Sequence, residues 1–313
     1  MAVSVSIVLC SHKDSELIDR SLQSVITQTY TDFEVVVVGD GDPPGLEGRC
    51  SSHLDRRIRY VPIIAGGLTK ALIHGIECAK GEYVARLDVG DEMRCDRLEK
   101  QLTKLSDRSD IGMVSSNFGM YTVDGDFLYK TNYSTKTLRN SLLNPIAPEF
   151  ELPIHASVTF RKNVYQSAGG YREEFYYAQD CDLWLRMGEL CLIDNIDEVL
   201  TDGLFLINGI SATKKTLQEQ YKQLAIDSAM VRRSGQGEDN VLNSGLTSTT
   251  LKGATAVETL IDNTDFYYFV AKCLYDNRNP RDSVYLAQVL RNKPWHLRGL
   301  LLWIRILYRR LML

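Results

Sequence analysis

GEYVARLDVGDEMRCD, residues 81–96, is the stretch of sequence that decides the fold of this chain. A turn glycine opens it, a short run rich in apolar residues follows, and Asp88 and Asp91 come at the end of that run. An apolar run of this length, ended by acidic residues and glycine, is typical of a buried strand that finishes in a loop. Ligands of open α/β sheets bind beyond the carboxyl ends of the strands, so Asp88 lies where a ligand is expected.

Two carboxylates in one short turn can share a hard divalent cation, which prefers oxygen ligands and often keeps phosphates as partners. Asp88 and Asp91 have this spacing. The alternative is an acidic turn that caps the helix expected to begin near Asp96, and for these residues alone it is the more common arrangement. The neighbouring segments have to decide between the two interpretations.

The segment before this stretch predicts a βαβ unit. Residues 3–10 alternate between apolar and polar side chains and residues 33–38 are continuously apolar, so both predict strands. Apolar residues at helical spacing lie between them, and the crossover should be right-handed. Asp40 follows the second strand, where it could accept hydrogen bonds from a base or a ribose. A simple Gly/Asp turn is the alternative.

Two later segments also place charged residues at the start of helices. Lys70 follows a pair of glycines and could reach a diphosphate, although a solvated helix lysine is the more common arrangement. Asp180 and Asp182 precede a helix that contains Leu183 and Trp184. They could be catalytic, but acidic residues are also favoured in the first turn of any helix.

Composition limits the class of protein. The 313 residues suffice for one large α/β domain with a smaller appendage, and a net charge of −4 gives no electrostatic case for nucleic acid. The seven cysteines are scattered, without a CxxC pair, which predicts neither disulfides nor a zinc site and favours a reducing cytoplasm. The apolar run at residues 3–10 is too short for a signal peptide, and we expect no membrane-spanning segment.

The last hundred residues predict helices. Residues 213–233 have a helical pattern, residues 234–250 are rich in Gly, Ser, Thr and Asn and predict a linker, and residues 254–290 contain two more helical patterns. Residues 295–313 predict a basic amphipathic helix, which is typical of contact with an anionic membrane. The alternative is a terminal helix that packs on the protein or on a second subunit.

Three long segments, in this order, resemble the family 2 glycosyltransferases with a GT-A fold. VSIVLCSHK with SLQSVITQTYTDFEVVVVGDGD resembles the first βαβ unit of the family. GLTKALIHGIECAKGEYVARLDVGDEMRCDRLEKQL resembles the region of its Asp-x-Asp motif, and HASVTFRKNVYQSAGGYREEFYYAQDCDLWLRMGE resembles its acceptor-side segment. The resemblance implies a Rossmann-like, doubly wound and mostly parallel sheet in residues 1–212, with a helical C-terminal region in residues 213–313.

The resemblance also implies a role for each matching residue. Ser11 and Asp40 would hold the nucleoside, Asp88 and Asp91 would hold a cation, and Asp180 would be the catalytic base. We expect the cation to be Mn²⁺ or Mg²⁺.

Four positions not yet assigned a role, Lys70, Arg86, His155 and Gln179, complete the expected site. Lys70, Arg86 and Asp88 are expected to bind the nucleotide-sugar. His155 and Gln179 are expected on the acceptor side, although a structural role for His155 is an equal alternative.

The chain departs from the family pattern at four positions. Gly39 replaces the first Asp of the nucleotide-binding pair, and Gly90 stands where the second Asp of the metal motif is usual. Ile73 replaces a common Asn, and Gln179 replaces the usual Glu before the base. These changes leave open a non-catalytic binding or scaffold subunit. A sugar-1-phosphate nucleotidyltransferase is disfavoured, because SHKDS after the first strand is not a Gly-rich signature loop.

The expected function is therefore inverting sugar transfer from a nucleotide-diphosphate sugar to an acceptor hydroxyl, in the synthesis of a cell-surface glycan. A glycan or a lipid-linked sugar is the expected acceptor. The expected location is the cytoplasm, with peripheral contact on the inner face of the cell membrane.

Overall fold

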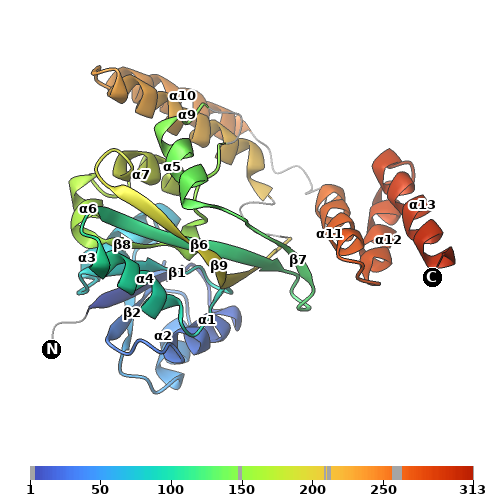
Figure 1. Ribbon diagram of the computed structural model, residues 1–313, viewed down its shortest axis with the longest axis horizontal. Coiled ribbons are helices and arrows are strands. Elements are labelled where there is room, and N and C mark those ends of the chain that lie inside the picture. The colour runs from blue at the N-terminus through green and yellow to red at the C-terminus, as the bar shows by residue number, and fades with distance from the viewer. Residues whose placement is uncertain (1–3, 147–149, 208, 210–212, 256–262, 313) are drawn as a thin grey trace. The chain divides into compact units, whose positions relative to one another are not determined.

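The computed structural model describes residues 4–146, 150–207, 209, 213–255 and 263–312 (Figure 1). The strands, with one short 3₁₀ helix (η1), are β1 Val5–Ser11, β2 Phe33–Asp40, β3 Ile58–Ile63, β4 Tyr83–Arg86, β5 Glu92–Met93, β6 Ile111–Tyr121, β7 Phe127–Lys130, η1 His155–Ser157, β8 Thr159–Arg161 and β9 Leu192–Leu204. The α-helices are α1 Leu17–Ile26, α2 Leu46–Ser52, α3 Leu68–Cys78, α4 Arg97–Asp107, α5 Thr135–Leu143, α6 Lys162–Ser167, α7 Gln179–Met187, α9 Lys215–Arg233, α10 Asp239–Thr255, α11 Thr264–Asp276, α12 Asp282–Asn292 and α13 Leu297–Leu311.

The chain forms two compact units. Unit 1 comprises Met1–Phe118, Thr131–Gly203 and Thr216–Gly253. Unit 2 comprises Gly119–Lys130, Leu204–Lys215 and Ala254–Leu313.

The sheet of unit 1 has the strand order β3-β2-β1-β4-β8-β6-β9-β5. The first four strands are parallel, whereas β8 pairs antiparallel with both β4 and β6, and β5 pairs antiparallel with β9. The sheet is therefore mixed, and only its N-terminal half is parallel. The βαβ units predicted from the sequence make up that half, because parallel neighbours need a crossover helix between them.

Helices cover both faces of this sheet (Figure 1). Successive side chains of a strand point to opposite faces, so the apolar run of β2 supplies two cores. Val36 and Val38 pack with α3, α6 and α7 in one core, and Val35 and Val37 pack with α1, α2 and α4 in the other. This arrangement explains why β2 is continuously apolar rather than alternating.

Unit 1 continues beyond the predicted boundary at residue 212. Tyr221, Leu224 and Ala225 of α9 are buried in the core that contains α7, so α9 belongs to this unit. The sequence predicted a linker at 234–250, whereas the structure places α10 at Asp239–Thr255. Residues 239–247 of this helix are exposed or half-buried, which fits their largely polar composition.

Unit 2 joins the end of the β6–β7 hairpin to α11, α12 and α13. The Asn277 amide donates hydrogen bonds to the backbone oxygens of Phe127 (3.0 Å) and Leu128 (2.7 Å). The Phe205 ring stacks on Phe266, with 4.9 Å between ring centroids. Within the described residues, no helix is both long and apolar enough to cross a bilayer.

Arg97, the first residue of α4, is a fully buried arginine in unit 1. Its guanidinium donates hydrogen bonds to the backbone oxygens of Ala156 (2.7 Å), Arg86 (3.0 Å) and Val158 (3.1 Å). It also donates to the Thr201 hydroxyl (2.9 Å) and to the Gln101 amide oxygen (3.1 Å). One side chain thus joins the ends of β4 and η1, the start of β8 and the far end of β9.

Arg97→Ala is expected to lower the free energy of unfolding by about 3–5 kcal/mol, because removing one partner of a buried charged network leaves the other groups unpaired. Urea denaturation measures this change. The matched control is Arg108→Ala, which removes an exposed arginine paired with Asp110 and should leave the urea midpoint nearly unchanged. Equal losses in the two variants would contradict a structural role for Arg97.

Candidate functional site

The carboxyl ends of the parallel strands bring several of the predicted residues to one edge of the sheet. Ser11 ends β1 and lies opposite Gly39 of β2, beside Asp40. Arg86 ends β4 and lies opposite Val8 of β1. Residues at this edge can face a common ligand, because parallel strands all end on the same side.

Asp40 holds the loop that leads into α3. Its carboxylate accepts hydrogen bonds from the backbone N–H groups of Gly66 (2.7 Å) and Gly67 (3.0 Å). Gly67 has a φ of +86°, and a Cβ atom at this position would lie 2.7 Å from the ring of Tyr176. The loop therefore requires a glycine, and Asp40 has a definite structural role in addition to the binding role that the sequence predicts.

Ser11 shapes the turn after β1. Its hydroxyl donates a hydrogen bond to the backbone oxygen of Lys13 (2.7 Å). On α3, Lys70 is half exposed and lies 3.3 Å from the Glu173 carboxylate. An exposed ion pair of this kind is weak, so the Lys70 ammonium can turn toward another anion at little cost.

Arg86 is fully buried, and its guanidinium faces the predicted cation site. It donates a hydrogen bond to the carboxylate of Asp88 (2.7 Å) and another to the backbone oxygen of Val8. The Asp88 side chain is 46% exposed, so one side of this carboxylate is open to solvent. Arg86 thus orients the Asp88 carboxylate from the protein interior and is not itself exposed to solvent.

Asp88 and Asp91 lie in one tight turn. The Asp91 N–H donates to the backbone oxygen of Asp88 (3.1 Å), and Gly90 between them has a φ of +97°. A Cβ atom on Gly203 of β9 would lie 2.8 Å from a carboxylate oxygen of Asp91, so that glycine gives Asp91 its room.

The donor set of this turn fits a hard divalent cation. Within the described residues, no three His, Cys, Asp or Glu side chains come together as metal ligands. Mg²⁺ commonly binds proteins through one or two carboxylates and takes its other ligands from water and substrate phosphates. Asp88 and Asp91 supply two carboxylates, so the other ligands of such a cation would be water and substrate phosphates.

Arg97 is a site residue that the sequence analysis missed. Burial lowers its pKa to about 9, while the negative charges of Asp91 and Asp88 raise it, so the guanidinium is positive at neutral pH. The sequence does contain a signal, because Arg97 and Gln101 interrupt the buried face formed by Leu98, Leu102 and Leu105. Polar residues at core-facing positions of a helix indicate a buried polar network.

His155 is buried and forms a pair with Tyr171. The Nε2 atom of His155 is 2.6 Å from the Tyr171 hydroxyl and accepts a hydrogen bond from Arg86 (3.3 Å). Burial, and then the positive charge of Arg86, lowers the pKa of His155 to about 4, against smaller raising effects of Asp88 and Asp180. The imidazole is therefore neutral at physiological pH, with its proton on Nδ1, because Arg86 can only donate.

Asp180 lies in the first turn of α7, after Ala178 with a φ of +52°. Its carboxylate accepts a hydrogen bond from the Cys181 N–H (2.9 Å) and is partly exposed. The charges of Asp180 and Asp88 both act on the buried His155–Tyr171 pair. Carboxylates from two distant segments are therefore both close enough to influence this pair, and the preceding Gln179 is buried.

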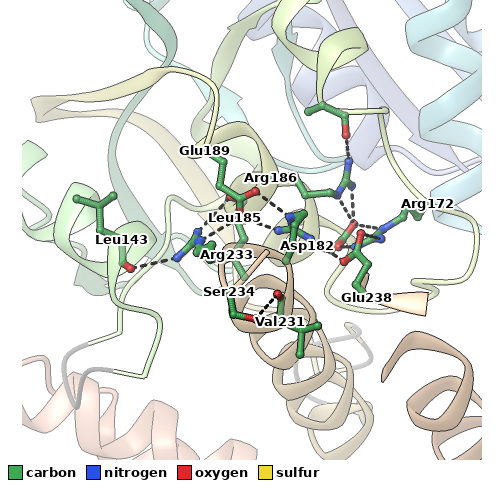
Figure 2. A network of polar contacts seen from close by, with 12 residues as sticks. Leu143, Arg172, Asp182, Leu185, Arg186, Glu189, Val231, Arg233, Ser234 and Glu238 are labelled. Carbon is green, nitrogen blue, oxygen red and sulfur yellow. Dashed lines mark hydrogen bonds and ion pairs between the residues drawn. The ribbon is translucent and has the colours of Figure 1, made fainter. Parts of the chain in front are cut away.

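Asp182, two residues later, has a different environment (Figure 2). It is buried and forms ion pairs with Arg172 and Arg186. Arg172 also pairs with Glu238 (2.9 Å), which lies just before α10, and Glu238 pairs with Arg232 of α9 (2.6 Å). Asp182 thus links the start of α7, through Arg172 and Glu238, to α9 and α10. Of the two acidic residues, Asp182 is enclosed and Asp180 is accessible.

Comparison with known proteins gives a consistent result. The model of the family "Glycosyl transferase family 2" matches residues 6–165, just over half of the chain. The O-antigen biosynthesis glycosyltransferase WbnJ of Escherichia coli is 28% identical over 219 residues, covering 68% of this chain and 83% of WbnJ. The amylovoran biosynthesis glycosyltransferase AmsE of Erwinia amylovora is 28% identical over 193 residues, covering 60% of this chain and 70% of AmsE.

Solved structures show the same fold. The crystal structure of S. aureus TarS 1–349 superposes with a TM-score of 0.58 at 12% identity, covering 92% of this chain and 88% of TarS. The complex of TarS with UDP-GlcNAc gives a TM-score of 0.58 at 14% identity, with 92% and 89% covered. The predicted α/β fold of GT-A type, with a helical C-terminal region, is confirmed.

The low pKa of His155 predicts a pH dependence of stability. An unfolded chain takes up a proton at this residue below about pH 6.5, whereas the native state does so only near pH 4. The contribution is therefore fully present above pH 6.5, and up to about 3 kcal/mol is lost as the pH falls toward 4. Wild type should lose this amount relative to His155→Gln, as measured by urea denaturation across that range. A difference that does not change with pH would contradict the buried neutral imidazole.

Proposed function

The chain belongs to glycosyltransferase family 2, and from this premise we propose that it moves a sugar from a nucleotide-diphosphate sugar to an acceptor hydroxyl with inversion at the sugar carbon. The observation that carries the proposal is the arrangement around His155 and Tyr171, on which the charges of Asp88 and Asp180 both act. One carboxylate follows a parallel strand and the other opens a helix, so donor and acceptor can meet between them.

The donor is bound at the edge formed by β1, β2 and β4. Ser11 and Asp40 contact the nucleoside, and Lys70 pairs with the diphosphate in place of Glu173. The solved structure of TarS with UDP-GlcNAc supports a uridine diphosphate sugar as the donor class. Arg86 is buried and acts through Asp88, which it orients.

Asp88 and Asp91 would hold Mn²⁺ or Mg²⁺ when the cation is bound. A bound divalent cation would neutralise the charge that develops on the leaving diphosphate. The two buried guanidinium groups, Arg86 and Arg97, balance the charge of the carboxylates from the protein side. The hydrogen bond from the Asp91 N–H to the Asp88 backbone oxygen holds the turn, and Arg86 orients the Asp88 carboxylate.

Asp180 takes the proton of the acceptor hydroxyl. As that oxygen attacks the sugar carbon, the bond between this carbon and the diphosphate oxygen breaks, so a single displacement inverts the configuration. A general base must lie within hydrogen-bond reach of the proton that it removes, and the partly exposed Asp180 meets this requirement better than the enclosed Asp182. WbnJ and AmsE take part in polysaccharide biosynthesis, which supports a glycan or a lipid-linked sugar as acceptor.

Asp180→Asn is expected to lower kcat by about 10²–10⁴-fold, because the amide cannot accept the acceptor proton. This variant should still bind the donor, as measured by the thermal protection that UDP-sugars give. Glu174→Gln makes the same change at an exposed carboxylate and should keep wild-type activity. Full turnover in Asp180→Asn would rule out the assignment, and donor binding without transfer in the wild type would favour a non-catalytic subunit.

Asp88→Asn and Asp91→Asn are expected to raise the Mn²⁺ concentration that gives half-maximal activity by at least about tenfold, since the loss of even an outer partner of a metal has effects of this size. EDTA should abolish transfer by the wild type, and added Mn²⁺ should restore it. The control is Asp32→Asn, an exposed carboxylate before β2. An unchanged Mn²⁺ dependence in both Asp88→Asn and Asp91→Asn would show that the cation, if required, binds elsewhere.

A further inference from the structure

Within the part of the chain that the structure describes, the outward face of α13 in unit 2 is apolar and exposed. It consists of Leu297, Leu301, Ile304, Tyr308 and Leu311, each between 52% and 84% exposed. These residues follow one another at intervals of four and three, so they form one stripe along the helix. Trp303 and Leu307 widen the stripe, and Trp295, just before the helix, is 89% exposed.

The opposite face of α13 already has a partner. Leu302 and Ile306 are buried against Ala271 of α11 and against Leu286 and Val289 of α12. The helix therefore gains its packing within unit 2 from one side, and the exposed stripe is additional apolar surface. Isolated exposed apolar residues are normal, but a continuous stripe of this length marks an interaction site.

The charges around the stripe are of one sign. The last acidic residue of the chain is Asp282, and the residues after it include Arg291, Lys293, Arg298, Arg305, Arg309 and Arg310. Asp282 pairs with Arg309 and Arg310. Among the described residues, neither Arg298 nor Arg305 pairs with an acid, and on a helical wheel both lie at one edge of the stripe.

A groove adds a second feature at the same edge. It has a volume of about 590 Å³, and its walls include Tyr275, Arg278, Ile304, Arg305 and Tyr308. Apolar side chains beside arginines suit a molecule that carries both an acyl chain and a phosphate.

We propose that α13 is an interfacial helix that docks unit 2 on an anionic phospholipid bilayer. The apolar stripe would enter the boundary between headgroups and acyl chains, with Trp295, Trp303 and Tyr308 at the level of the headgroups. Arg298 and Arg305 would pair with lipid phosphates. A second copy of the chain fits this face less well, because two such faces would bring arginines of like charge together.

Binding of the full-length protein to vesicles tests the proposal. Vesicles of phosphatidylcholine mixed with phosphatidylglycerol should bind the protein, and binding should fall as salt is raised, whereas vesicles of phosphatidylcholine alone should bind at least about tenfold more weakly. The double variant Leu301→Gln with Ile304→Gln should bind the mixed vesicles at least about tenfold more weakly than wild type. Leu143→Gln with Leu190→Gln, at exposed positions of unit 1, should bind like wild type.

A second double variant, Arg298→Gln with Arg305→Gln, tests the charge independently and should weaken binding to the mixed vesicles by about tenfold. Wild-type binding in both α13 double variants would overturn the proposal. A second result would also overturn it. If the wild type binds no vesicles and sediments as an oligomer, and the Leu301→Gln with Ile304→Gln variant sediments as a monomer, the face joins two copies of the chain. No sugar transfer is measured in these assays, so their failure is distinct from failure of the proposed function.

Discussion

The placement of one positive charge, that of Arg97, is the constraint on which the centre of unit 1 depends. A fully buried guanidinium is costly to remove from water, and it is tolerated only where its donors are satisfied and negative charge is near. Here five hydrogen bonds satisfy it, three of them to the backbone oxygens of Arg86, Ala156 and Val158. These carbonyls lie where β4 gives way to the acidic turn and where η1 gives way to β8. The architecture of the sheet and the geometry of the candidate site therefore rest on the same side chain.

The buried arginines also determine how charge is distributed in the candidate site. Arg86 and Arg97 supply two buried positive charges close to Asp88 and Asp91, and the hydrogen bond from Arg86 orients the Asp88 carboxylate. Burial, and then the positive charge of Arg86, lowers the pKa of His155, so the imidazole stays neutral. Departures such as Gly90 are compatible with this arrangement, since the positive φ at that position suits a glycine and the turn brings Asp91 close to Asp88.

The segment around α7 shows how two similar acidic residues come to differ. Asp182 is enclosed by Arg172 and Arg186, and Arg172 carries the network on to Glu238 (Figure 2). The fixed start of α7 leaves Asp180 in its first turn and partly open to solvent. In unit 2 a similar difference occurs within one helix. Leu302 and Ile306 of α13 pack inward, whereas the apolar stripe on the other side is exposed among the described residues.

The sequence by itself determined what depends on local pattern. Apolar periodicity located the parallel strands and their helices, and turn residues after those strands identified Asp40, Asp88 and Asp91 as candidates. Tertiary structure alone decided what depends on partners distant in the chain. Examples are the burial of Arg97, the neutral state of His155, the separation of Asp180 from Asp182, and the antiparallel half of the sheet. The segment at 234–250 was predicted to be a linker, whereas α10 begins within it at Asp239. Polar composition alone does not distinguish a linker from a helix. Local spacing fixes which face a side chain occupies, but the energy of a buried charge depends on which groups the fold brings against it.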